Sequence, residues 1–268
     1  MRRWSRTYDP GSRDHRVGQY SPLAEQGTSR ARPPPGTHHR RHLRPPAPAK
    51  RTHLPWRHVP HQVCLPFPLR YSEDLDLVRR SHTQIGPVFD ALREVAVETG
   101  LSVHSTSLGP FPKMRLEAPA TNSNAKLRIK IEINTHETSP AQPLVALPYE
   151  VTSTWFTGEC ILTTFTSAEL VSTKLRALFQ RSKGRDVFDL WLALEQLRLD
   201  PQAIVDCFGP YRPEGYTASR AIDNLRAKLK VSGFREDLSL LVTALPDGYD
   251  IDTASELIID SLLSKVPG

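Results

Sequence analysis

The middle of the chain alternates hydrophobic and polar residues with a period of two, which is the pattern of β-strands with one buried face. Residues 126–134 show it most clearly, with Leu and Ile on one side and charged residues and Asn on the other. Residues 74–78 repeat it, so that two aspartates share one face and two leucines the other. Further strands are predicted at residues 101–106 and 113–117 and, with weaker patterns, at 144–147 and 161–165.

Apolar residues at helical spacing predict helices before and after these strands. Residues 85–96 form one amphipathic stretch, and Gly100 follows as a stop signal. The sequence Thr166-Ser167-Ala168-Glu169 has the pattern of a capping box ahead of another helix. After Gly184 the chain is almost wholly helical, with helices predicted at 188–197, from Asp200-Pro201, from Thr217, and at 238–245 and 254–263.

Together these elements predict an α+β protein with two folded parts behind a tail. A mixed sheet with flanking helices takes up residues 69–183, and a C-terminal helical bundle takes up residues 184–268. Residues 1–68 are rich in proline and poor in periodic apolar residues, so this segment is predicted to be disordered.

Charge is distributed unevenly between these parts. Residues 1–68 contain 13 Lys and Arg against 3 Asp and Glu, a net charge of +10, and 12 of the 24 prolines. The remaining 22 basic and 26 acidic residues give residues 69–268 a net charge of −4. The overall charge of +6 therefore belongs to the tail alone. Such a tail is a solvated basic segment, a nucleic-acid-binding arm, or a product of translation in the wrong frame.

Cysteine spacing and hydropathy exclude several other classes. The three cysteines, Cys64, Cys160 and Cys207, lie far apart without a Cys-x-x-Cys pair, so neither a zinc ribbon nor a disulfide scaffold is expected. The sequence has no apolar run near the ~20 residues that a membrane span needs, and no signal segment at its start. We therefore expect a soluble, cytoplasmic protein without a membrane partner.

The best candidates for chemistry are carboxylates on the predicted strands. Asp74 and Asp76 are one pleat apart on the same face, so their oxygens can converge on a divalent cation such as Mg²⁺. Glu132 adds a third carboxylate if its strand neighbours theirs, and such a cluster would itself require a cation. The alternative is that all three line the solvated face of a sheet.

The capped helix provides cations. Lys174 and Arg181 are seven residues apart and so lie on one side, where they could hold a triphosphate or the charge of a transition state. Solvent-facing helix positions are the alternative. Asp186 follows closely and would either orient a basic residue or cap the next helix.

In order along the chain, these segments resemble the AbiEii/AbiGii toxin family of polymerase-β-like nucleotidyltransferases. The resemblance covers about residues 69–195. It implies the toxin of a bacterial toxin–antitoxin or abortive-infection pair, which uses a nucleoside triphosphate and Mg²⁺ and has an AbiEi-like antitoxin as partner. Some relatives modify tRNA, so an RNA acceptor is implied. The segments are Arg70-Tyr71-Ser72-Glu73-Asp74-Leu75-Asp76-Leu77, Ile129-Lys130-Ile131-Glu132-Ile133-Asn134, Lys174-Leu175-Arg176-Ala177-Leu178 with Arg181, and Arg185-Asp186-Val187-Phe188-Asp189-Leu190.

By motif position, the resemblance also implies roles for single residues. Asp74 and Asp76 would hold the metal ions, with Glu132 as the third acid. Lys174 would contact the nucleotide phosphates, and Asp186 matches the acidic residue of the last motif. The resemblance further implies phosphate or nucleotide contacts for Ser72, Arg181 and Arg185, self-modification or phosphorylation at Ser72, and a supporting role for Asp189.

One family feature is missing, namely a Gly-Gly-Ser/Thr turn shortly before the Asp-x-Asp strand, which grips phosphate. Residues 53–62 stand in its place. Read one nucleotide forward, the codons of residues 55–59 can encode Arg-Gly-Gly-Thr. We therefore hypothesise that residues 1 to about 67 come from the wrong frame of a GC-rich gene, through a frameshift near residues 66–68.

Three functions remain open from the sequence. The first is a nucleotidyltransferase toxin. The second is a catalytically impaired remnant that lacks the Gly-Gly-Ser/Thr turn and only binds a partner or RNA, because positioning of the phosphates is most of what a protein contributes to this reaction. The third is a metal-dependent nuclease.

Overall fold

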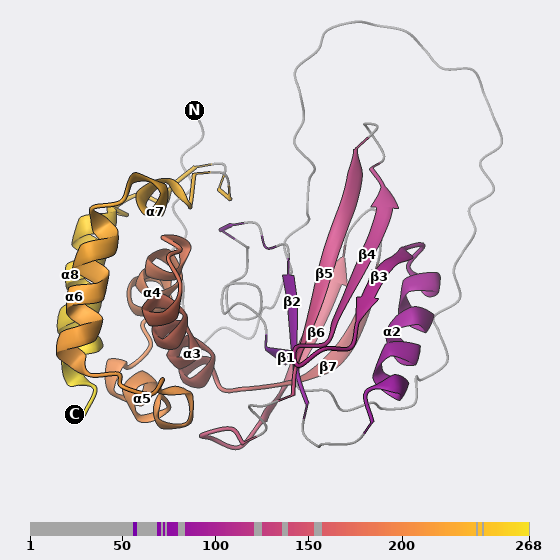
Figure 1. Ribbon diagram of the computed structural model, residues 1–268, viewed down its shortest axis with the longest axis horizontal. Helices are drawn as coiled ribbons and strands as arrows, with labels where there is room; N and C mark the ends of the chain where they lie inside the picture. The colour runs from indigo at the N-terminus through magenta and orange to yellow at the C-terminus, as the bar shows by residue number, and fades with distance from the viewer. Residues whose placement is uncertain are drawn as a thin grey trace, which may run out of the picture.

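A computed structural model of the chain describes residues 56–57, 69–70, 72, 74–79, 84–120, 125–135, 139–152, 157–239, 241–242 and 244–267, with the backbone alone at 56–57. The fold consists of a sheet with one helix on its outer face and a group of helices beside its opposite face (Figure 1). None of the helices in the described part of the chain combines the length and apolar character that a membrane crossing requires.

Seven strands form one mixed sheet, in the order β3-β4-β5-β2-β1-β7-β6. The pairs β2–β5 and β1–β7 are parallel, and all other neighbours are antiparallel. The predicted mixed sheet is therefore confirmed. The strands are β1 (Trp56–Arg57), β2 (Asp74–Val78), β3 (Ser102–Ser107), β4 (Lys113–Pro119), β5 (Lys126–Asn134), β6 (Val145–Thr152) and β7 (Thr157–Thr164).

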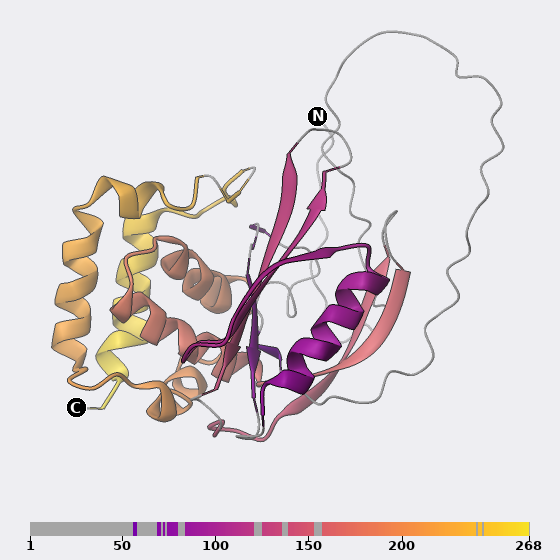
Figure 2. The same ribbon diagram turned by 45° about the vertical axis from the view of Figure 1, so that its right-hand side comes forward.

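The apolar face of β2, β4 and β5 packs against helix α2 (Gly86–Glu98), as the alternating pattern requires (Figure 2). Phe89 and Ala96 of α2 are buried there. The opposite, polar face of the same strands is turned toward the other helices and carries the carboxylates (Figure 1). The sheet residues of this core are Leu77, Met114, Leu116, Ile131 and Ile133.

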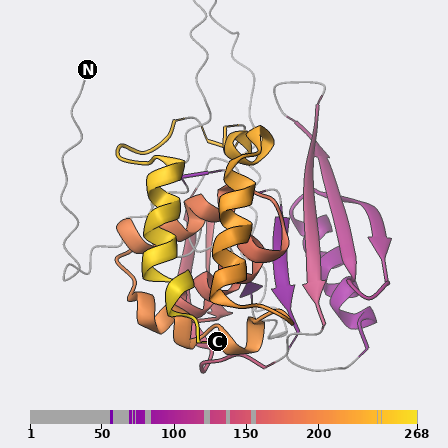
Figure 3. The ribbon, with the colours of Figure 1, turned by 60° about the vertical axis from the view of Figure 1, so that its left-hand side comes forward.

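The other helices share a second, larger core, in which α6 and α8 stand side by side (Figure 3). Many of its fully buried members come from α3 and α4, which pack against each other; α3 also contacts α5 and α6, and α4 contacts α8. The predicted helical C-terminal part is thus observed. The helices are α3 (Ser167–Gln180), α4 (Arg185–Glu195), α5 (Pro201–Asp206), α6 (Ala218–Leu229), α7 (Ser232–Glu236) and α8 (Ile251–Ser261).

Three helix starts follow the predicted capping signals. Thr166 accepts a hydrogen bond from the backbone N–H of Glu169, Asp200 caps α5 and Thr217 caps α6. The carboxylate of Glu169 is fully buried and accepts from the N–H groups of residues 141 and 142 and from the hydroxyl of Tyr211. This residue therefore ties the start of α3 to the loop before β6 and to the segment after α5.

Two sequence predictions were wrong. The described residues of 238–245 form turns, a bend and irregular backbone rather than a helix. At the end of this segment Pro246 disfavours helical backbone at Leu245, which is itself 52% exposed. Trp56–Arg57, inside the segment predicted to be disordered, form the short interior strand β1 between β2 and β7. Hydrogen bonds between the backbones of β1, β2 and β7 do not depend on whether the side chains of residues 56 and 57 are apolar, so this pairing needs no apolar pattern. The rest of the disorder prediction, residues 1–55 and 58–68, lies outside the described residues.

Candidate active site

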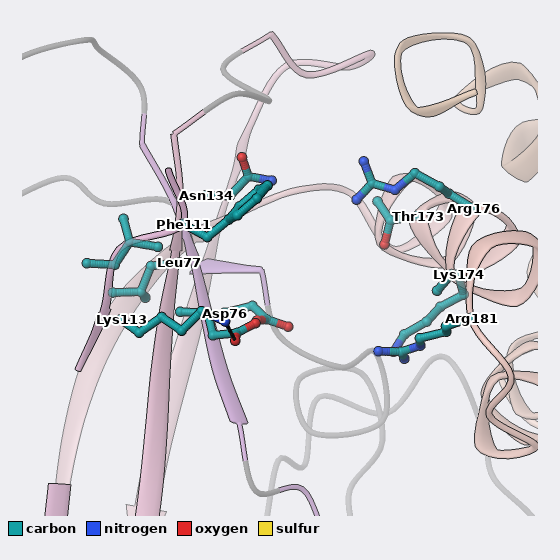
Figure 4. A pocket seen from close by; sticks show the side chains of 12 residues that line it. Asp76, Leu77, Phe111, Lys113, Asn134, Thr173, Lys174, Arg176 and Arg181 are labelled. Carbon is teal, nitrogen blue, oxygen red and sulfur yellow. Dashed lines mark ion pairs between the residues drawn. The ribbon is translucent and has the colours of Figure 1, made fainter. Parts of the chain in front are cut away.

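A cavity of about 250 Å³ lies between the polar face of the sheet and helix α3. Figure 4 shows side chains from β2 and the β4 region on one side, facing side chains from α3 on the other. The charged residues that line it are Asp76, Lys113 and Glu132 from the sheet, and Lys174, Arg176 and Arg181 from α3 and the residue after it. The cavity is thus bounded by carboxylates on one side and by cations on the other.

The carboxylates of Asp76 and Glu132 form the acidic wall of the cavity. They come from adjacent parallel strands, where Asp76 of β2 is the register partner of Glu132 of β5. Asp74 is the partner of Lys130 on the same face, but it does not line the cavity. The alternating pattern of the two strands therefore places all three acids on one face, with two of them at the cavity.

Two lysines neutralise part of this acidic face. The Nζ of Lys130 lies 2.9 Å from Oδ2 of Asp74 and 3.3 Å from Oε1 of Glu132, and the Nζ of Lys113 lies 3.0 Å from the same Glu132 oxygen. Burial alone would raise the pKa of Glu132, but the hydrogen bond from Lys113 and the charge of Lys130 outweigh it and lower the pKa. Glu132 is therefore ionised at neutral pH.

Lys174, Arg176 and Arg181 form the basic wall. The Nζ of Lys174 lies 3.0 Å from Oδ2 of Asp189, a carboxylate that is 1% exposed. The same carboxylate accepts two hydrogen bonds from Arg70, at 2.7 Å from Nε and 2.8 Å from Nη2. Because Asp189 serves both cations, α4 holds Lys174 of α3 and the segment before β2 in a fixed relation.

Arg181 is fixed in the same way by Asp186. Its Nε and Nη2 donate to the two carboxylate oxygens of Asp186 at 2.8 and 2.7 Å, and Asp186 is fully buried. The hydrogen bond to Asp186 raises the pKa of Arg181 against the effect of burial, and the charges of Asp186, Asp189 and Asp76 add to it. Asp186 thus pairs with a basic residue, whereas the cap of α4 is Gly184.

The comparison with protein families identifies the chain. Residues 62–256, well over half of its length, match the model of the family described as nucleotidyl transferase AbiEii toxin, type IV toxin–antitoxin system. The chain belongs to this AbiEii family. It is accordingly a nucleotidyltransferase toxin by family, for which an antitoxin partner and a nucleoside triphosphate substrate are implied. The resemblance deduced from the sequence is confirmed.

Solved structures similar to this AbiEii chain include two from Helicobacter pylori. A putative nucleotidyltransferase is 17% identical over 81% of this chain and 90% of its own, with a TM-score of 0.48. JHP933 is 17% identical over 72% and 74%, with a TM-score of 0.43. MenT4, a nucleotidyltransferase toxin from Mycobacterium tuberculosis H37Rv, is 14% identical over 74% and 79%, with a TM-score of 0.33. The comparison with curated proteins gives no match.

Two of the residues predicted for phosphate or nucleotide contacts lie away from the cavity of this AbiEii chain. Arg185 points to Asp237, with its backbone N–H 3.3 Å and its Nε 3.8 Å from the carboxylate oxygen. Ser72 is half-buried, and its hydroxyl donates to the backbone carbonyl of Asp74 at 3.4 Å. Neither residue lines the cavity.

The donor chemistry of the acidic wall fits a hard divalent cation. No group of three or more His, Cys, Asp or Glu side chains in the described residues is arranged to hold a metal ion. Two carboxylates that face one cavity are nevertheless the donor set that Mg²⁺ uses together with substrate phosphates. The predicted set of three is therefore represented at the cavity by Asp76 and Glu132, while Asp74 is paired with Lys130.

Sequence reasoning missed several cavity residues, which are Lys113, Phe111, Asn134, Thr173 and Arg176. One of them could have been found from spacing alone, because Asn134 is two residues after Glu132 on a strand and so shares its face. Thr173 and Arg176 are one and two positions from Lys174 on α3, a spacing that does not predict a shared helix face. Lys113 faces Glu132 only through the antiparallel register of β4 and β5, for which the sequence offers no local signal.

Proposed function

We propose that this AbiEii toxin transfers a nucleotidyl group from a nucleoside triphosphate to a hydroxyl of an RNA acceptor, with tRNA as the acceptor class, in the cytoplasm. The observation that carries the proposal is the pair of opposed walls, Asp76 and Glu132 against Lys174 and Arg181, around one cavity. A polyphosphate needs cations around its oxygens, and a reacting phosphate needs carboxylates that can hold its counter-ion.

The basic wall would bind and orient the phosphates. Lys174 is a point charge with three donors, and Arg181 offers a planar fork that suits phosphate oxygens. Asp189 and Asp186 do not reach the cavity and act as positioning residues, because each holds one of these cations through a buried carboxylate. Preorganised cations of this kind stabilise developing negative charge without further rearrangement.

The acidic wall would hold Mg²⁺ through Asp76 and Glu132, with Asp74 two residues away as a further ligand. When bound, the ion would neutralise charge on the reacting phosphate and on the leaving group. The acceptor oxygen attacks the α-phosphorus, the bond from that phosphorus to the bridging oxygen of the β-phosphate breaks, and pyrophosphate leaves. The proton of the acceptor hydroxyl passes to a carboxylate of the acidic wall.

The missing Gly-Gly-Ser/Thr turn supports a second candidate, a remnant that binds RNA or a partner without turnover. We propose that the turn was lost by a frameshift that makes residues 1 to about 67 out-of-frame sequence. In support, the family match begins at residue 62, just after residues 55–59, whose shifted codons can encode Arg-Gly-Gly-Thr. Coding DNA whose third-position bases give no Gly-Gly-Thr would remove this explanation.

The experiment that tests the proposal is label transfer. The chain as given and a version with the shifted frame restored are incubated with each α-labelled nucleoside triphosphate, Mg²⁺ and total tRNA. We expect label on RNA with the restored version, and its loss with Asp76→Asn but not with Asp90→Asn, which lies exposed on α2 at the other face of the sheet.

The outcomes separate the candidates. Transfer by the restored version alone supports the transferase and makes the chain as given a remnant. No transfer by either version, or equal transfer by Asp76→Asn, refutes the mechanism. RNA degradation that needs no nucleotide would identify a metal-dependent nuclease instead.

A further inference from the structure

The chemistry of the cavity changes along its length. The carboxylates of the acidic wall face Lys174 and Arg181 at one end, whereas Phe111 and Asn134 face Thr173 and Arg176 at the other (Figure 4). The first end has the charges that a polyphosphate needs. The second end combines an aromatic ring with neutral and cationic hydrogen-bonding groups, which is a different kind of ligand environment.

Phe111 is an unusual residue for its place. Its side chain is 61% exposed at a cavity that is otherwise lined largely by polar groups. The backbone around it is nevertheless anchored to the end of β5, because the carbonyl of Pro112 accepts from the N–H of Ile133 at 2.9 Å and that of Pro110 accepts from the hydroxyl of Thr135 at 3.3 Å. The ring is thus presented on a fixed segment.

The cavity is small for a complete nucleoside triphosphate. Binding sites for ligands of drug size usually have volumes of about 300–1,000 Å³, and this cavity has about 250 Å³. A triphosphate held between the two walls therefore leaves the rest of the nucleotide to extend to the end where Phe111 is exposed. Stacking on an exposed aromatic ring is the interaction that every nucleobase can make.

We infer that Phe111 is the stacking platform for the nucleobase of the incoming nucleoside triphosphate, with Asn134 and Arg176 meeting the edge of the base. This inference rests on the proposed function, because it assigns the triphosphate to Lys174 and Arg181. Stacking accepts all four bases, so selection among them falls to the amide of Asn134, which both donates and accepts. The site is thus divided into a phosphate end and a base end.

The test measures binding of each nucleoside triphosphate and of inorganic tripolyphosphate to the full chain in Mg²⁺ buffer. We expect Phe111→Ala to weaken nucleoside triphosphates by about 5- to 150-fold while tripolyphosphate is unaffected. Phe111→Trp should restore the loss. The matched control is Leu108→Ala in the same loop, because Leu108 is 68% exposed and does not line the cavity. Asn134→Ala should even out the affinities of the four triphosphates.

The outcomes distinguish this inference from the proposed function. If the chain binds triphosphates but Phe111→Ala binds them as tightly as the unaltered chain, the base platform is refuted and the phosphate site stands. An Asn134→Ala variant with unchanged base preference refutes the role of Asn134. Weaker RNA binding with unaltered triphosphate binding would assign the ring to the acceptor and also overturn the inference. If neither ligand binds the unaltered chain or the frame-restored version, both proposals fail.

Discussion

The two walls of the cavity hold their charges in different ways. On the basic wall, Lys174 and Arg181 each pair with a carboxylate that is almost or fully buried. On the acidic wall, Glu132 pairs with Lys113 and Lys130, and all three side chains are about one-third exposed. The carboxylates that hold the two cations are therefore buried in the helical part, although Arg181 itself is 46% exposed, whereas both partners of each acidic-wall ion pair are partly exposed.

Because of this difference, substitutions on the two walls should differ in how far they change the stability of the fold. Buried ion pairs are costly to break, because removal of one partner leaves an uncompensated charge. Half-exposed pairs contribute little to stability, because water screens them. We therefore expect changes on the acidic wall to affect activity almost alone, and changes behind the basic wall to affect stability as well.

The largest expected effect tests the acidic wall. Asp76→Asn and Glu132→Gln should each lower nucleotidyl transfer by about 10⁴-fold, or about 5 kcal/mol, because loss of a ligand removes the counter-charge at the reacting phosphate. The free energy of unfolding in urea should change by less than about 1 kcal/mol. Single-turnover assays measure the loss of transfer and urea melts measure the free energy of unfolding, both on the frame-restored protein. A large loss of stability would contradict the proposed difference between the two walls.

The second expected effect tests the buried side of the basic wall. Asp189→Asn should lower the free energy of unfolding by about 3 kcal/mol, because it leaves Arg70 and Lys174 without their shared carboxylate. Asp74→Asn is the matched control, since Asp74 is 40% exposed and pairs with Lys130 at the surface. Equal urea midpoints for the two variants would show that loss of the buried carboxylate costs no more stability than loss of the exposed one.

The same contrast explains which features could be read from the sequence. Period-two alternation predicts β2 and β5, because the pattern lies within each strand. It also predicts that Asp76 and Glu132 lie on the polar face of their strands, opposite the buried apolar face. The capping signal at Thr166 likewise predicts the start of α3. Local patterns thus identify the acidic wall and the helix that carries the basic wall.

Long-range partners could not be read in this way. Asp186 follows Arg181 closely, and the sequence allowed both an ion pair and a helix cap for it. The ion pair forms in the structure, where α4 packs against α3. The bond from Arg70 to Asp189 spans 119 residues and has no local signature. Phe111 lies in a loop outside any periodic pattern, so its position at the cavity depends on the antiparallel pairing of β4 and β5.

A third, smaller effect compares two arginines that the sequence placed in the same role. Arg181→Lys keeps a charge beside Asp186 but loses the planar fork, so binding of tripolyphosphate should weaken by about 10-fold. Arg185→Lys should leave it unchanged, because Arg185 pairs with Asp237 outside the cavity. Isothermal titration of both variants measures this, and similar losses would show that both arginines contact phosphate.

The smallest effect concerns the lysine that lowers the pKa of Glu132. Lys113→Met removes the hydrogen bond that opposes the effect of burial, so the pKa of Glu132 should rise. Because the folded-state pKa of Glu132 lies below its ordinary value of 4.5, its ionised form adds stability above that pH and loses this contribution as the pH falls through the folded-state pKa. The stability difference between the unaltered chain and Lys113→Met should therefore be largest at neutral pH and shrink in acid. Carboxyl NMR titration measures the pKa of Glu132, and urea melts at neutral and at acid pH measure the stability difference. If Glu132 titrates at the same pH in both proteins, Lys113 does not lower its pKa.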